Sequence, residues 1–233
     1  MSYVHDSYSD SGLDPVPVRK GYAAWSEVYD SMLTGVLEEP ILDRFNKHLP
    51  PSPLCVADLG CGTGRTAQWL LDHASVASID GVDISPEMLD IARGKDIYRN
   101  LLLEDIQDCS LPHDAYSLVV NVLTACHLES IENLYATAGR LLKPNGMFWI
   151  LDLHPHILLS GGGTVVPVPS GESVYIQNHI HLLSEHTQCA RDHGFDFWDF
   201  HETLVAKDWG SKSSYSKFID HPLGFGFSWE KQN

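Results

Sequence analysis

The chain has 233 residues, of which 43% are hydrophobic and 20% charged, and this length suits one α/β domain with elaborations. Lys plus Arg number 15 against 31 Asp plus Glu, for a formal net charge of −16. Because phosphate binding depends largely on Lys and Arg, this imbalance disfavours a nucleic-acid partner. No apolar run approaches the ~20 residues of a membrane span, and the polar start has no signal-peptide core, so a cytoplasmic protein without a membrane partner is expected.

The N-terminal part, residues 1–50, is predicted to be a lead-in followed by lid helices. Residues 1 to about 18 are polar and expected to be mobile. Over 22–48, aromatic and apolar residues recur at helical spacing, and Pro40 is expected to interrupt them. These helices are expected to lie against a second region, 51–233.

In that second region, apolar runs alternate with helical patterns, which indicates right-handed crossovers and a parallel sheet. Buried strands are predicted at 54–58, 78–83, 101–103, 116–122 and 147–151. Helices are predicted at 63–72, 86–93, 131–142 and 184–193. Two aromatic stretches, 195–205 and 218–230, complete the expected fold: a doubly wound, seven-stranded, mostly parallel sheet with helices on both faces and an antiparallel last strand. A turn is expected at 143–146, and a loop-rich insertion at about 154–182.

A glycine-rich turn, Asp58-Leu59-Gly60-Cys61-Gly62-Thr63-Gly64, follows the first predicted strand and opens a helix. Glycines at such a turn let the backbone approach a ligand closely and adopt positive φ angles. The dinucleotide-binding fingerprint needs a glycine where this chain has Arg65, so a nucleotide-dependent oxidoreductase is disfavoured. The turn alone also fits a simple tight turn.

Acidic residues end the next two predicted strands. Asp83 lies 19 residues after Gly64, where its carboxylate could accept hydrogen bonds from both hydroxyls of a ribose. Asp105 offers a carboxylate for an exocyclic amine, and Ile106 an apolar surface for an adenine ring. Together the strand ends predict an adenosine-like ligand at the carboxyl edge of the sheet.

These motifs resemble the class I S-adenosylmethionine-dependent methyltransferases, specifically their small-molecule branch. The likeness covers about residues 20 to 152, including 82–89, 141–146 and a pair of upstream tyrosines. It implies S-adenosylmethionine as cofactor, S-adenosylhomocysteine as product, and methyl transfer to O, N or C of a small metabolite, for instance in secondary metabolism. The cofactor contacts implied are Asp58, Gly60, Gly62, Asp83, Ile84, Met88, Asp105, Ile106, Asn121 and Tyr29. The alternative is a non-catalytic S-adenosylmethionine- or S-adenosylhomocysteine-binding regulatory or activator protein; either would be a monomer or homodimer.

Histidines follow the fourth and fifth predicted strands, where they would face the methyl group. Methyl transfer depends mostly on alignment, and a histidine of near-neutral pKa suits any deprotonation that the acceptor needs. His154 is the first candidate for this general base, and His127 the second. The residues predicted to border the acceptor are Tyr22, His156, His179 and His181.

A metal site is an alternative use of these histidines. His179 and His181 would point the same way in a strand, but the spacing offers no convincing carboxylate partner, so no metal is predicted. The five cysteines are scattered singly, which fits reduced thiols better than disulfides or structural zinc.

Overall fold

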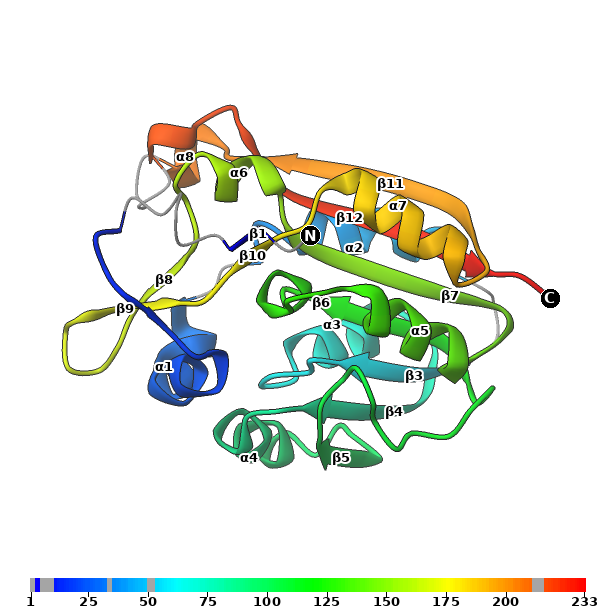
Figure 1. Ribbon diagram of the computed structural model, residues 1–233. Helices are drawn as coiled ribbons and strands as arrows, with labels where there is room; N and C mark the ends of the chain where they lie inside the picture. Colours follow the sequence, from blue (N-terminus) through cyan, green and yellow to red (C-terminus); the bar gives the residue numbers. More distant parts are fainter. Residues whose placement is uncertain (1–2, 5–10, 33–34, 50–52, 211–215) are drawn as a thin grey trace.

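A twisted seven-stranded sheet forms the centre of the protein (Figure 1). The computed structural model describes residues 3–4, 11–32, 35–49, 53–210 and 216–233. The strands of the sheet are β3 (Leu54–Leu59), β4 (Val76–Asp83), β5 (Asn100–Leu103), β6 (Tyr116–Val122), β7 (Leu142–Leu153), β11 (Phe195–Leu204) and β12 (Pro222–Lys231). Their spatial order is β11-β12-β7-β6-β3-β4-β5.

The chain winds outward from β3 in both directions. β3 pairs in parallel with β4 on one side and β6 on the other, while β5 and β7 extend the two halves in parallel. β12 pairs antiparallel with both β7 and β11, so it alone runs against the other described strands of this sheet. The expected doubly wound architecture is thus confirmed. Its topological switch point lies between β3 and β6, and open α/β sheets bind ligands at such points.

Helices cover both faces of the sheet. Successive side chains of a strand point to opposite faces, and here apolar side chains point to both, so each face must be buried. Phe148 and Ile150 of β7 pack with α5 (Glu132–Leu141) and α7 (Leu183–Asp192). Trp149 and Leu151 pack on the opposite face with α2 (Glu39–Asn46) and α3 (Arg65–His73). Within the described residues, none of the helices combines the length and apolar character needed to cross a bilayer.

Local signals explain most element boundaries. α4 (Pro86–Gly94) begins where predicted, because the Ser85 hydroxyl accepts a hydrogen bond from the Met88 N–H as an N-cap. Pro40 does not separate two helices: α1 spans Val18–Met32, and Pro40 lies in the first turn of α2, where its missing N–H is not needed. The turn expected at 143–146 is part of β7 instead, with Asn145 at a φ of 60°.

The segment predicted as an insertion, 154–182, packs beside α1 (Figure 1). It contains α6 (Pro155–Leu159), β8 (Thr164–Pro167), β9 (Ser173–Ile176) and β10 (His179–Ile180). The predicted mobile lead-in contributes β1 (Tyr3–Val4), which pairs with β10, and β2 (Pro15–Val16), which pairs with β9; its residues 1–2 and 5–10 lie outside the described part. Trp25 of α1 shares a small core with Ile176. α1 therefore has a fixed position over the edge of the large sheet.

Candidate functional site

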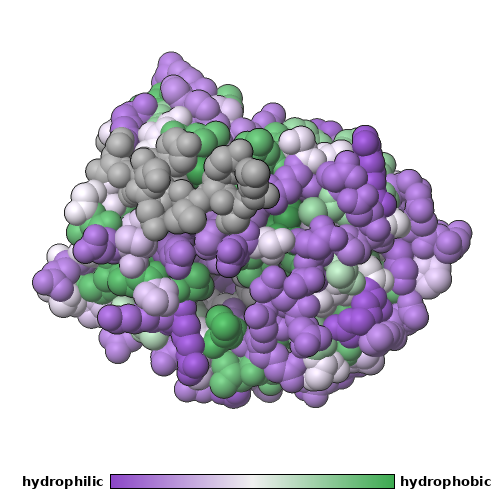
Figure 2. Space-filling view, in the orientation of Figure 1, coloured by the Kyte–Doolittle hydropathy of each residue, from purple (hydrophilic) through white to green (hydrophobic). Residues whose placement is uncertain are grey.

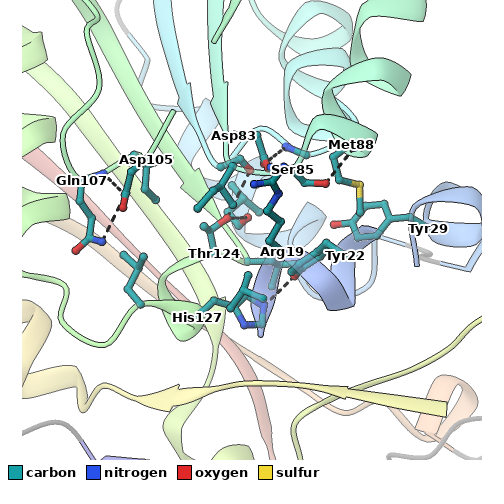
Figure 3. Close-up of a pocket in the computed structure, with 18 of the residues that line it drawn as sticks. Arg19, Tyr22, Tyr29, Asp83, Ser85, Met88, Asp105, Gln107, Thr124 and His127 are labelled. Atoms are coloured by element: carbon teal, nitrogen blue, oxygen red, sulfur yellow. Dashed lines mark hydrogen bonds between the residues drawn. The ribbon is translucent and has the colours of Figure 1, made fainter. Parts of the chain in front are cut away.

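A cavity of about 260 Å³ lies at the carboxyl ends of β3, β4 and β6, where α1 covers the topological switch point (Figure 3). Its walls come from α1 and from the segments that follow strands of the large sheet. The residues that line it are Val18, Arg19, Tyr22, Tyr29, Gly60, Gly62, Asp83, Ile84, Ser85, Met88, Asp105, Ile106, Gln107, Val122, Leu123, Thr124, His127, Leu128 and Glu129.

The glycine-rich turn forms one wall of this cavity. Gly60, Gly62 and Gly64 have φ angles of 78°, 52° and 87°, in the left-handed region that residues with a side chain avoid. A Cβ at Gly60 would collide with the Thr124 side chain, whereas one at Gly62 would meet nothing within 4 Å. The bare backbone therefore leaves room for a ligand against the turn.

The carboxylate of Asp83 is held at the end of β4 by backbone amides. Its Oδ2 accepts a hydrogen bond of 2.8 Å from the Gly62 N–H, and its Oδ1 accepts one of 2.8 Å from the Ser85 N–H. Burial raises the pKa of Asp83, and these backbone donors oppose that shift. Each carboxylate oxygen has a further lone pair, so Asp83 can accept two ligand hydroxyls.

An apolar slot lies beside Asp83. Met88 of α4 is 1% exposed and lines it together with Ile84 and Ile106. At its rim, Asp105 Oδ1 accepts a hydrogen bond of 2.8 Å from the Gln107 N–H. Apolar faces with a carboxylate at the rim fit a flat heterocycle that carries an exocyclic amine.

A second cavity, of about 30 Å³, adjoins the first at the glycine-rich turn, since Gly60 and Gly62 line both. It is lined by Tyr29 and by an ion pair between Arg65, the first residue of α3, and Glu38. One cation and one anion here match the charges of an amino acid's carboxylate and ammonium groups. Glu38 and Arg65 were not among the site residues predicted from the sequence. A signal was available for Arg65, because it occupies the position where the dinucleotide-binding fingerprint needs a glycine.

Two predicted cofactor contacts do not line either cavity. Asp58 is 1% exposed and accepts a hydrogen bond of 2.7 Å from the Tyr98 hydroxyl. Burial raises the pKa of Asp58 to about 7, although the Tyr98 bond lowers it. Asn121 is fully buried, and its Nδ2 donates to the Leu59 carbonyl across 2.7 Å. Both side chains lie within the sheet beneath the turn, so they support its backbone instead of lining the ligand space.

His127 is the histidine that lines the larger cavity, and both of its ring nitrogens are engaged. Nδ1 donates to the Gln177 carbonyl across 2.7 Å, because a carbonyl can only accept. Nε2 of the neutral ring then accepts from the Tyr22 hydroxyl across 2.9 Å. Burial lowers the pKa of His127 to about 4. The ring is therefore neutral near pH 7.

The other predicted histidines lie away from the cavity lining. β7 continues to Leu153, two residues beyond its predicted end, and places His154 beside β12, where its N–H donates to the Leu223 carbonyl. His154 Nε2 lies 2.8 Å from Glu202 Oε1. Burial lowers the pKa of His154, although the Glu202 carboxylate acts to raise it. The structure therefore does not bring the first-choice base to the cavity.

The three histidines predicted to border the acceptor also contact other parts of the protein. His156 Nε2 lies 2.8 Å from His221 Nδ1, and His181 Nε2 donates to the Leu128 carbonyl across 2.8 Å. His179 is buried in β10. In the part of the chain that the structure describes, no three His, Cys, Asp or Glu side chains group as metal ligands do, and all five cysteines are free thiols.

Comparison with known proteins agrees with this geometry. Residues 57–150 match the family model described as a methyltransferase domain. The chain is 28% identical over 152 residues to a malonyl-[acyl-carrier protein] O-methyltransferase of Halorhodospira halophila, an alignment that covers 63% of this chain and 51% of that protein. It is 23% identical to an uncharacterized methyltransferase of Emericella nidulans, with 79% of this chain and 77% of the relative covered. The chain thus spans only about half the length of the first of these relatives.

A solved structure extends the likeness to the fold. The S-adenosylmethionine-dependent methyltransferase from Mesorhizobium loti superimposes with a TM-score of 0.66 at 20% identity, over 83% of this chain and 97% of that one. The sheet order and the helices on both faces are therefore those of this fold.

Proposed function

Because the chain belongs to the class I S-adenosylmethionine-dependent methyltransferases, we propose that it transfers a methyl group from S-adenosylmethionine to a small-molecule acceptor. The observation that carries this proposal is the position of Asp83. Its carboxylate lies between the glycine-rich turn and the N-terminus of α4, with both oxygens oriented by backbone amides. A ribose diol is the ligand group that such a carboxylate accommodates.

The residues present fit each part of this cofactor. Met88, Ile84 and Ile106 would enclose the adenine ring, with Asp105 toward its amine. Arg65 and Glu38 would face the methionine carboxylate and ammonium groups, beyond the open backbone at Gly62. When bound, the cofactor supplies an electrophilic methyl group on a sulfonium sulfur. The protein supplies alignment and exclusion of water through the α1 cover.

Oxygen is the acceptor atom favoured by the comparisons, because several relatives are named O-methyltransferases. A small acceptor is favoured by the enclosure of the site: α1 shares a core with Val166 of β8 and Ile176 of β9. We also propose that the protein is a monomer or homodimer. The net charge of −16 supports the further proposal that it has no nucleic-acid partner.

Calorimetric titration with S-adenosylmethionine, S-adenosylhomocysteine and NADH tests the proposal. We expect micromolar binding of both sulfur ligands and none of NADH. Absence of binding by a folded sample would reject it. Binding without formation of S-adenosylhomocysteine over a broad acceptor panel would favour the regulatory alternative.

A further inference from the structure

Among the described residues that line the larger cavity, no side chain is suited to remove a proton from a neutral acceptor. His127 Nδ1 donates to the Gln177 carbonyl and Nε2 accepts from the Tyr22 hydroxyl, so neither nitrogen has a lone pair directed to an acceptor. The low pKa of His127, about 4, adds to this, because an alcohol or phenol has a pKa of about 10 or higher.

The other titratable groups of the lining do not replace it. Burial raises the pKa values of Tyr22 and Tyr29 above the usual value for tyrosine, so both hydroxyls stay protonated. Asp83 accepts from two backbone amides, and Asp105 accepts from Gln107. Glu129 lines the cavity but is exposed, so water competes for its carboxylate.

Among the described residues that line the larger cavity, one cationic side chain is available to an acceptor. Arg19 of α1 lines the larger cavity, and among the described residues no carboxylate forms an ion pair with it. Lining the smaller cavity, Arg65 is already paired with Glu38. Arg19 precedes Tyr22 by one helical turn, so both project from the same face of α1, and Figure 3 shows them together at the cavity. Figure 2 shows that hydrophilic residues predominate on this face of the molecule. The chain has a net charge of −16, so a guanidinium without a carboxylate partner among the described residues is distinctive here.

We propose that the acceptor is a carboxylate, already ionised when it binds, and that Arg19 binds it. This rests on the proposed function. The planar guanidinium suits a carboxylate and repels an ammonium group. A carboxylate oxygen forms the new bond to the methyl carbon while the methyl–sulfur bond breaks and leaves its electron pair on sulfur. The products are a methyl ester and S-adenosylhomocysteine, and no proton has to be removed.

Two measurements on the whole chain test this. The first uses S-adenosylmethionine with a tritiated methyl group and a panel of aliphatic and aromatic carboxylic acids, each with its matching alcohol and amine. We expect label on the acids alone, released by alkali as volatile methanol, at a rate that is flat from about pH 6 to about pH 9, where a carboxylate is fully ionised. Alkali-stable label on alcohols or amines would overturn the proposal, as would no transfer to any acid.

The second measurement compares Arg19→Gln and Arg19→Lys with the control Lys20→Gln, which changes the exposed neighbouring cation. With the labelled acid, Arg19→Gln should raise the acceptor KM and the acceptor Kd of the S-adenosylhomocysteine complex about tenfold or more, and Arg19→Lys should restore part of this. The affinity for S-adenosylmethionine should change by no more than about twofold, because the lost contact stabilises only the bound acceptor.

Titration with S-adenosylmethionine distinguishes failure of this inference from failure of the proposed function. If Arg19→Gln weakens S-adenosylmethionine binding and leaves the acceptor KM unchanged, Arg19 binds the cofactor's own carboxylate and the inference is wrong. If wild-type protein binds neither sulfur ligand, the proposed function fails first.

Discussion

The Tyr22 hydroxyl donates a hydrogen bond to His127 Nε2 across 2.9 Å and so joins α1 to the loop that follows β6. The same imidazole donates to the Gln177 carbonyl, just after β9. Three segments that are distant in sequence therefore meet at one ring at the edge of the cavity.

Tyr22→Phe should loosen this junction. The substitution leaves a buried imidazole nitrogen without its donor, which costs about 1–3 kcal/mol of the free energy of unfolding. Urea denaturation measures this loss. The comparison variant is Ser31→Ala, which removes an exposed hydrogen bond of the same helix, from the Ser31 hydroxyl to the Val28 carbonyl. Equal stability of Tyr22→Phe and wild type would show that the bond contributes nothing in solution.

Asp83→Asn should reduce S-adenosylmethionine affinity by about tenfold to a hundredfold. One carboxylate oxygen becomes an amide donor, which cannot accept from a ribose hydroxyl or from the backbone N–H that faces it. Calorimetry gives the Kd, and Asp72→Asn, an exposed acid of α3, serves as the control. Unchanged affinity would remove Asp83 from the cofactor site.

Gly60→Ala should impair both folding and cofactor binding. Gly60 has a φ of 78°, and the added Cβ would collide with Thr124. Gly94→Ala is the matched control, because Gly94 lies in α4 with nothing within 4 Å of an added Cβ. We expect the control to be neutral or slightly stabilising, by up to about 1 kcal/mol, since alanine favours helices. Thermal melts and calorimetry of both variants check the contrast.

The buried carboxyl of Asp58 should make stability depend on pH. Burial raises its pKa to about 7, against about 3.9 in an unfolded chain. The folded state therefore binds this proton more tightly, and the resulting stabilisation is complete below about pH 4 and lost as pH rises toward about 7. Relative to Asp58→Asn, wild type should lose up to about 4 kcal/mol across that window. A difference that stays constant with pH would contradict the raised pKa.

His154→Gln should leave cofactor affinity and turnover close to those of wild type. The side chain pairs with Glu202 and caps α6 by accepting from the His156 N–H, and it does not line the cavity. The expected cost is about 1 kcal/mol of folding stability from the lost cap. Steady-state kinetics decide the matter: a large fall in kcat at unchanged stability would restore His154 as the general base.

Short-range patterns determined the strands, the glycine-rich turn and the start of α4 at Pro86, which Ser85 caps. Each depends on residues within a few positions of one another, so periodicity, glycine content and capping chemistry are enough to predict them. The position of Asp83 beside the turn also followed from sequence, since neighbouring parallel strands end at the same edge of a sheet.

The directions of side chains at the site depended on tertiary structure. Two more residues of pairing between β7 and β12 carry His154 past the cavity, and the depth of Asp58 and Asn121 beneath the turn reflects packing in the sheet. Arg19 and Tyr22 reach the cavity because α1 packs against β9, more than a hundred residues later in the chain. No local pattern encodes such contacts, because they arise only when distant segments share a core.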